Sequence, residues 1–546
     1  MIENFSDGGP VRAHDICIVG AGPIGIALAF ACAKAGMNVL MLESGLAAPD
    51  AAQIELGRGL FADPATHTAL EEANCRALGG TSHWWGGRLI PFDAIDFARR
   101  PWVTHAAWPL AYEDFARWSD AAADFFQCGP AQFALPNPWP ELTGVRFDEL
   151  ERWAPSPNLK HLYGEALAQS RRIQLLLGAT VTDLEFADDL TRVVSLTAKD
   201  RTRTISISSP RIALACGGVQ TQRLMLSVQK TRPSLFGGVD GPLGRFYMGH
   251  NFGKIAEVVL NDPARAADFK FFMHEGAYVR RRFTIPAETQ TRDKLLQISF
   301  SPGNALIAEP EHRSGALSAM WLALASPLGK RILSPALLRL YVGEERRYGA
   351  HIANIATDFF PTMWALRGIL WNKYVRRPSE PNVFLRNRGG RYTLFYHAEQ
   401  TPAADNRITL ASETDALGMP RALVAFSYSM PDCEAIVRAH HVLADALRES
   451  GVATLEFKDG DDAARAANVR AQARDGMHQI GGARMSATPN QGVVDGNCRV
   501  HGVDNLFVTS TCVFPTSGHA NPTFTGVMLA LRLADQLAKA RAIATT

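Results

Sequence analysis

The six residues Gly20-Ala21-Gly22-Pro23-Ile24-Gly25 form a complete GxGxxG turn, a pattern that binds the phosphates of dinucleotides. Gly20 permits the tight turn, Gly22 lets the backbone approach a pyrophosphate, and Gly25 lets the next helix lie close to its strand. Glu43 follows 18 residues after Gly25, where a carboxylate can bind both ribose hydroxyls. The acid disfavours NADP, whose 2′-phosphate would face it, but the turn alone does not separate FAD from NAD.

A second chemical feature, Asn521-Pro522, stands near the C-terminus. Asparagine is a preferred helix N-cap and proline a preferred first helical residue. The amphipathic run from Thr525 to Ala540 supports a helix there. The positive end of that helix would face the loop that carries Asn521.

Strands and helices around these features predict an α/β fold with a Rossmann-like sheet. A strand at 15–19, the glycine turn, a helix through Ala35 and a strand at 38–42 form an opening βαβ unit. Further strands are predicted at 211–215, before a helix that includes 222–227, and at 505–509. The cofactor domain is therefore expected to be discontinuous, comprising 14–253 and 476–546, after a polar, flexible lead-in at 1–13.

The inserted residues 254–475 are expected to form a substrate-binding domain. Alternating patterns at 295–300, 391–396 and 423–428 predict an antiparallel sheet, with a helix at 432–450 beside it. Residues 316–375 are predicted to be a helical insertion rich in Trp, Leu and Arg. Packed helices, a lid, a subunit contact and a membrane-touching surface all stay open for this segment.

The composition is that of an ordinary globular enzyme, with 47% hydrophobic and 20% charged residues. A net charge of +2 gives no reason to expect a nucleic-acid partner. The eight cysteines show no CxxC spacing, which argues against zinc, iron–sulfur clusters and a disulfide framework. With no signal peptide and no apolar run long enough to span a membrane, a soluble, cytoplasmic protein is expected. Export with a partner that carries its own signal stays open.

Several separated motifs resemble those of the glucose–methanol–choline (GMC) oxidoreductases. The run 76–87, Arg-Ala-Leu-Gly-Gly-Thr-Ser-His-Trp-Trp-Gly-Gly, resembles that family's second flavin-binding signature. Ala215-Cys216-Gly217-Gly218 resembles a strand end near the adenine, and 244–250 resembles the segment that leads into the substrate domain. The run 477–485, Met-His-Gln-Ile-Gly-Gly-Ala-Arg-Met, resembles the loop of the catalytic histidine, and Asn521 stands at the family's usual distance, 43 residues after His478.

The resemblance implies a flavoprotein that binds FAD. Some family members attach FAD through a histidine four residues after the Gly-Gly pair of the second signature; Trp84 occupies that place here and His83 precedes it. Non-covalent FAD is therefore expected, and no metal ion. The implied FAD-binding residues are the glycine turn with Glu43, and in addition Gly80, Thr81, Ser82, Trp85, Gly86, Gly87, Val181, Cys216, Gly217, Ser510, Asn521, Pro522 and Thr523.

The same resemblance implies oxidation of an alcohol to a carbonyl, with hydride transfer to flavin N5. His478 is the expected base because imidazole titrates near the working pH. Asn521 is expected to hold the substrate hydroxyl and to cap the last helix, whose positive end would stabilise the reduced flavin. His519 is a candidate substrate contact, with a structural loop residue as the alternative.

The motifs look closest to bacterial sugar and polyol oxidisers, including pyranose 2-oxidase-like and glycoside 3-oxidising enzymes. A secondary hydroxyl of a sugar, glycoside or polyol is the leading substrate hypothesis. A sterol, aliphatic or choline-like alcohol, a redox-neutral flavin-containing lyase and a non-catalytic flavin subunit are the alternatives. Oxygen, a quinone or a separate electron-transfer protein could accept the electrons.

Overall fold

A six-stranded parallel sheet holds the glycine turn at the end of its central strand. The computed structural model describes residues 1–327, 342, 346–387 and 389–545. Register pairing is parallel throughout the sheet. The strand order is β1 (Ile2–Asn4), β7 (Ile173–Leu177), β3 (Val39–Glu43), β2 (Ile16–Val19), β11 (Ile212–Leu214) and β21 (Leu506–Val508).

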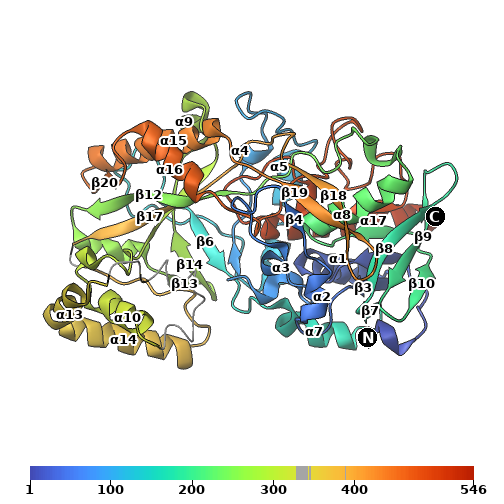
Figure 1. The fold of residues 1–546 in the computed structure, drawn as a ribbon, viewed down its shortest axis with the longest axis horizontal. Coiled ribbons are helices and arrows are strands. Elements are labelled where there is room, and N and C mark those ends of the chain that lie inside the picture. Colours follow the sequence, from blue (N-terminus) through green and yellow to red (C-terminus); the bar gives the residue numbers. More distant parts are fainter. Residues whose placement is uncertain (328–341, 343–345, 388, 546) are drawn as a thin grey trace.

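The Rossmann-like fold class is confirmed, because segments from the start, middle and end of the chain share this sheet. Helix α1 (Pro23–Lys34) follows the glycine turn, α8 (Gly218–Thr231) follows β11, and α17 (Thr523–Thr545) closes the chain. Helices α1 and α17 pack against each other, and both lie at the same end of the molecule as the two termini (Figure 1). Strands β2, β3, β7 and β11 are buried along their whole length, as expected for a parallel sheet covered on both faces.

The lead-in at 1–13 was predicted to be flexible, and for its first residues this is wrong. Ile2–Asn4 pairs with β7 as the edge strand β1. The amino group of Met1 donates to the carbonyl oxygen of Ile173 at 2.8 Å, and Phe5 is buried. Ile2 and Phe5 are too few apolar residues to show a periodic pattern, so the sequence did not predict this strand.

A second, antiparallel sheet dominates the other end of the molecule. Its strand order is β15 (Phe283–Thr284), β16 (Ile298–Gly303), β17 (Arg391–Ala398), β12 (Asn251–Leu260) and β20 (Ala453–Phe457). The amphipathic helix α15 (Met430–Glu449) and helix α16 (Asp462–Gln472) pack beside it and complete its apolar core. The predicted strands near 295–300 and 391–396 are confirmed in this sheet.

The third predicted strand belongs elsewhere. Strand β19 (Pro420–Ala425) pairs antiparallel with β18 (Arg407–Thr414) and parallel with β4 (Leu60–Phe61), and this small sheet packs on α8. The alternating pattern identified a strand with one buried face, but such a pattern does not say which sheet buries it.

Residues of the two predicted domains share one sheet and one apolar core, which the sequence did not indicate. A four-stranded sheet joins β5 (Arg88–Leu89) and β6 (Leu150–Trp153) to β14 (Ala277–Arg281) and β13 (Phe272–His274). Trp139 and Phe147, both before 253, lie in the same core as the antiparallel sheet. The division into 14–253 with 476–546 and 254–475 therefore stays a prediction.

One further sheet and several shorter helices complete the fold. A three-stranded antiparallel sheet joins β8 (Thr180–Phe186), β9 (Val193–Lys199) and β10 (Thr204–Ile207). The shorter helices are α2 (Ala51–Glu55), α3 (Leu70–Ala73), α4 (Ala94–Phe97), α5 (Tyr112–Ala116), α6 (Ser119–Phe126), α7 (Leu159–Gln169) and α9 (Ala287–Asp293).

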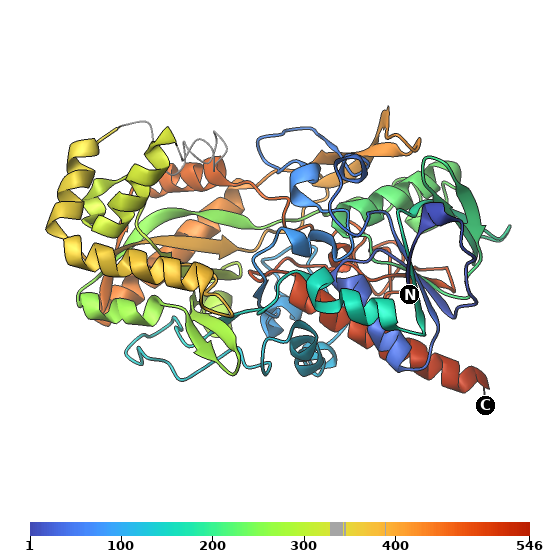
Figure 2. The same cartoon turned by 90° about the horizontal axis from the view of Figure 1, so that it is seen from below.

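The helical insertion lies at the end of the molecule opposite the parallel sheet, in both views (Figures 1 and 2). It contains α10 (Gly315–Ala325), α13 (Tyr348–Thr357) and α14 (Phe359–Tyr374), so the helical prediction for 316–375 is confirmed over these ranges. Residues 328–341 and 343–345 of that prediction lie outside the described residues. Within the described ranges, no helix is both long and apolar enough to cross a membrane.

We predict that Gly25→Ala destabilises the protein by about 1–3 kcal/mol, the usual range for overpacking. A Cβ at Gly25 would overlap the carbonyl oxygen of Gly20, which forces α1 away from its strand. Gly164→Ala in α7 is the matched control, because the nearest atom to its Cβ is a lysine Cγ at 3.7 Å. Chemical unfolding should show the loss in the first variant and no loss in the second; equal stability of the two would contradict this account of the glycine.

Candidate active site

The carboxyl ends of β2, β3 and β11 border a cavity of about 630 Å³. Its wall includes the N-termini of α1 and α17, so backbone N–H groups and two helix dipoles favour negative charge there. Most of the predicted site residues lie in this wall: Gly20, Gly22, Pro23, Ile24, Glu43, Gly80, Thr81, Ser82, Trp85, Gly86, Val181, Cys216, Gly217, His478, Ser510, Asn521, Pro522 and Thr523.

Three predicted residues lie outside the wall. Gly25 packs against the backbone of Gly20, as a spacer between helix and strand. Gly87 has a φ of +72° and its Cβ position faces Pro157, so it shapes the turn rather than the cavity. The ring of His519 is 1% exposed and is directed at Asp93 and Arg282, which does not place it at a substrate position.

Glu43 is held by backbone donors at the end of β3. The N–H of Ala21 donates to Oε2 and the N–H of Gly45 donates to Oε1, both at 2.7 Å. Burial raises the pKa of Glu43, although these two donors oppose the shift. Each carboxylate oxygen keeps a second lone pair, so the side chain can still accept two hydroxyl hydrogens from a ligand.

The polar atoms of the wall fit FAD. Among the described residues, Ser510 Oγ, Asn521 Oδ1 and Asn74 Nδ2 are buried without a hydrogen-bond partner, and all three residues line the cavity. Buried polar groups are nearly always satisfied, so such atoms indicate a bound polar group. Gly217 has open space at its Cβ position, which leaves room for close approach of a ligand.

His478 and Asn521 meet at one side of the cavity although 43 residues separate them. Asn521 Nδ2 donates to His478 Nε2 at 2.8 Å. Nε2 is therefore the acceptor nitrogen, and the ring proton of the neutral form lies on Nδ1. Nδ1 faces Asp475 Oδ2 at 3.5 Å.

Asp475 organises the loop that carries His478. Its Oδ1 accepts the N–H groups of Gly476, Met477 and His478 at 2.6, 2.8 and 3.2 Å, and its Oδ2 accepts the N–H of His250 at 2.7 Å. Burial alone would raise the pKa of Asp475, but the His478 ring and the backbone N–H of His250 hold it well below its ordinary value. A buried, ionised carboxylate therefore fixes the loop and orients the imidazole.

Two further histidines pack edge-on against His478. The ring centroids of His250 and His397 lie 4.8 and 5.3 Å from that of His478. Burial, followed by the nearby His478, lowers the pKa of His250 to about 3, and burial lowers the pKa of His397 as well. Both rings are therefore neutral near pH 7. His250 Nε2 lies 3.1 Å from the Ser517 carbonyl oxygen. Its Nδ1 has no hydrogen-bond partner among the described residues and lies 3.9 Å from Asp475 Oδ2.

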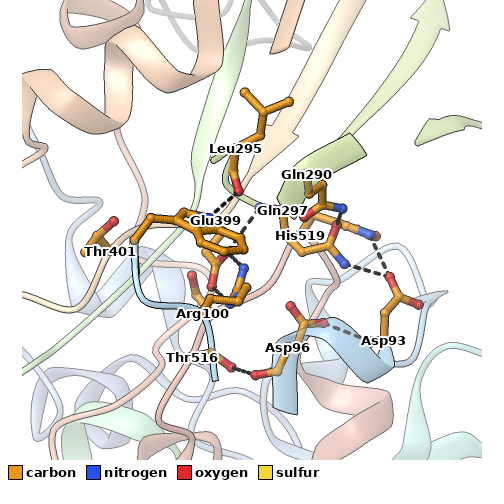
Figure 3. A network of polar contacts seen from close by, with 12 residues as sticks. Asp93, Asp96, Arg100, Gln290, Leu295, Gln297, Glu399, Thr401, Thr516 and His519 are labelled. Atoms are coloured by element: carbon orange, nitrogen blue, oxygen red, sulfur yellow. Dashed lines mark hydrogen bonds and ion pairs between the residues drawn. The ribbon is translucent and has the colours of Figure 1, made fainter. Parts of the chain in front are cut away.

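A buried polar network anchors the loop that carries Asn521 (Figure 3). The ring of His519 and the amide of Gln297 both contact the carboxylate of Asp93, at 3.1 and 2.9 Å. Glu399 receives two hydrogen bonds of 2.6 Å from Arg100 and another from the Gln297 N–H. Burial, with the nearby Glu149, raises the pKa of Asp93 to about 6.

This network reaches the histidine cluster through the backbone. The carbonyl oxygen of His519 accepts from His397 Nδ1 at 2.6 Å, and His397 packs on His478. His519 is therefore placed to position Asn521, two residues away.

The predicted side-chain cap at Asn521 is wrong. The helix α17 begins at Thr523, and Asn521 Oδ1 has no partner among the described residues, so it accepts no N–H from the first turn. The amide is directed at His478 instead. Sequence statistics identified the helix start correctly within two residues, but they could not show that the side chain serves the site.

Three wall or support residues were not among the predicted ones. Arg76 opens the second flavin-type motif and donates to Ser44 and Gln220, and Gln479 follows His478 directly; their places in known motifs were available signals. Asp475 gave no such signal, because its role depends on the loop folding back on its carboxylate.

Comparisons with known proteins agree with this architecture. A family model described as GMC oxidoreductase matches residues 402–530, and one described as FAD dependent oxidoreductase matches residues 15–237. Paromamine 6′-oxidase from Streptomyces fradiae is 28% identical over 137 residues, which span 25% of this chain and only 24% of that protein.

Solved structures share the fold over nearly the whole chain. Pyridoxine 4-oxidase from Mesorbium loti has a TM-score of 0.56 at 17% identity, covering 96% of this chain and 99% of its own. An FAD-dependent oxidoreductase from Chaetomium thermophilum has a TM-score of 0.53 at 14% identity, covering 97% and 100%. Formate oxidase from Aspergillus oryzae RIB40 has a TM-score of 0.51 at 16% identity, covering 98% and 99%.

We predict that Asp475→Asn lowers the free energy of unfolding by about 1–3 kcal/mol, because one carboxylate acceptor becomes an NH₂ group facing buried donors. The full decrease in unfolding free energy should appear above about pH 4, where the carboxyl of an unfolded aspartate is ionised. The decrease should become smaller as the pH falls toward the lowered pKa of Asp475 in the folded protein. Unfolding measured across this pH range tests the sign. The variant should also lose kcat more than it raises KM, because the imidazole loses its orientation.

Asp432→Asn is the control for a merely structural carboxylate. Asp432 is buried and accepts from Thr401 at 2.7 Å, away from the cavity wall. We expect this variant to lose stability and keep its kcat. Equal kcat values in the two variants would show that Asp475 has only a structural role.

Proposed function

We propose that this chain, which matches family models described as GMC oxidoreductase and FAD dependent oxidoreductase, oxidises a hydroxyl of a sugar, glycoside or polyol to a carbonyl. The observation that carries the proposal is the 2.8 Å contact between His478 and Asn521 at the cavity wall. Similarity to a protein named paromamine 6′-oxidase supports the choice of substrate class among alcohols.

We assign the cofactor to the cavity below the two helix N-termini. Gly22 leaves room for the pyrophosphate, Gly217 leaves room near the adenine, and Glu43 accepts hydroxyl hydrogens of the ribose. Ser510 Oγ and the N-terminus of α17 supply hydrogen-bond donors and positive potential. When bound, FAD supplies a hydride acceptor, flavin N5.

His478 and Asn521 act together on the substrate hydroxyl. A hydroxyl lying between them, in place of their direct contact, accepts from Asn521 Nδ2 and donates to His478 Nε2. His478 takes the hydroxyl proton at Nε2 as the carbon loses its hydrogen, and the imidazolium then carries a proton on both nitrogens. Asp475, ionised and 3.5 Å from Nδ1, stabilises that positive charge. Asn521 Nδ2 continues to donate to the oxygen as it becomes a carbonyl.

We predict that His478→Ala lowers kcat/KM by about 10²–10⁴, the usual contribution of a general base. The variant should keep its flavin absorbance, because the ring contributes one side chain to a large cofactor wall. His441→Ala is the control: this histidine is exposed on α15 and pairs with Asp462. Unchanged turnover in His478→Ala would remove the proposed base.

An alcohol panel tests the substrate class. We expect pyranoses, glycosides or cyclic polyols to bleach the bound flavin in the absence of oxygen, with faster bleaching than by aliphatic, choline-like or sterol alcohols. Repeating the titration with His478→Ala separates chemistry at this site from non-specific reduction. Bleaching by a non-sugar alcohol alone would overturn the sugar assignment and leave the alcohol oxidoreductase intact.

A further inference from the structure

The outer face of α14 exposes large apolar side chains to solvent. Phe360 is 82% exposed, Trp364 72% and Trp371 56%. Met363 and Leu370 are more than half exposed on the same helix, and Ile352 of the neighbouring α13 is as well. The positions 360, 363–364, 367 and 370–371 recur at helical spacing, so they form one stripe. We call these six apolar residues and Arg367 the α14 face.

The opposite side of α14 is already occupied. Thr362 is 2% exposed and its hydroxyl lies beside Gly315 of α10, while Ala365 packs with the small core formed by Ala316 and Leu317. The helix is thus apolar on its inner side and on its outer side. A helix that is apolar all round is normal in a core or in lipid and unfavourable in water.

Positive charge accompanies the apolar stripe. Residues 346–377 contain six basic residues and one acidic residue, although the whole chain has a net charge of only +2. Two of the six have acidic partners outside this range: Arg347 lies 2.6 Å from Glu311, and Arg376 lies 3.8 Å from Glu380. The guanidinium of Arg367 lies 5.1 Å from the ring centre of Trp364. A hollow of about 170 Å³ on this helix is lined by Trp364, Arg367, Gly368 and Trp371. Arg376 and Arg377 are exposed directly after the helix.

We propose that the α14 face docks the protein on an anionic lipid bilayer. Tryptophan is enriched at the membrane–water interface, and an arginine beside it can reach lipid phosphates. Clustered basic residues add attraction to anionic headgroups. Helix α14 has 16 residues and no described helix can span a membrane, so the helix lies in the plane of the surface.

Charge argues against a second copy of this chain as the occupant. A symmetric dimer places the same patch on both partners, so two faces with excess positive charge would meet. An anionic lipid surface instead complements that charge. The docking site lies at the end of the molecule away from the parallel sheet, so it leaves the cofactor end facing water (Figures 1 and 2).

Vesicle flotation with the flavin-loaded full-length protein tests the proposal. We expect the protein to float with phosphatidylcholine–phosphatidylglycerol vesicles, and to bind pure phosphatidylcholine vesicles about tenfold or more weakly. Phe360→Ser/Trp364→Ser/Trp371→Ser should abolish flotation. Arg367→Glu/Arg377→Glu should weaken it about tenfold or more at the same salt concentration.

Two control variants separate the α14 face from general surface effects. Val239→Ser removes a 65% exposed apolar residue outside the insertion, and Arg171→Glu/Arg201→Glu makes the same charge change at exposed sites elsewhere. Both should float like the wild type, and all variants should keep their flavin absorbance and melting temperature. Failure of the wild type to float would overturn the proposal. So would a concentration-dependent dimer that the triple variant dissociates. Neither result bears on the alcohol activity, which is measured separately.

Discussion

The buried carboxylate of Asp475 is the interaction on which the candidate active site depends. Four backbone N–H groups and the ring of His478 converge on its two oxygens. Leaving such donors unsatisfied is expensive, so the loop has one favourable conformation when the carboxylate is ionised. That conformation places the proton of the neutral imidazole on Nδ1, and Nε2 accepts a hydrogen bond from Asn521 Nδ2 at the cavity wall.

The second half of the site is fixed by a different set of charges. His519, Asp93, Gln297 and Glu399 hold the loop before Asn521 from behind (Figure 3). The carbonyl oxygen of His519 then bonds the ring of His397, which packs on His478. The loops of His478 and Asn521 are thus linked through His397, by one hydrogen bond and one ring contact. Such support keeps reacting groups within the narrow range of geometry that catalysis needs.

The candidate cofactor cavity and the helical insertion lie at opposite ends of the molecule (Figure 1). The parallel sheet and the N-termini of α1 and α17 border the cavity in which we propose the cofactor binds. The antiparallel sheet carries the helical insertion at the other end (Figure 1). His397 lies in β17 of the antiparallel sheet, Glu399 directly follows that strand, and Gln297 directly precedes β16. The antiparallel sheet therefore contributes one histidine of the cluster and supports the residues around it.

The sequence by itself determined the elements whose signals are local. The GxGxxG turn, the helix after Pro522 and the apolar strands follow from backbone sterics and from the burial of contiguous residues. Only the tertiary structure decided which sheet receives residues 420–425, that Ile2–Asn4 is an edge strand, and that Asn521 bonds His478 rather than its own helix. Asp475 and the His519 network were beyond reach of the sequence for the same reason. The free energy that stabilises Asp475 and the His519 network comes from contacts between residues far apart along the chain, and a local sequence pattern does not predict such contacts.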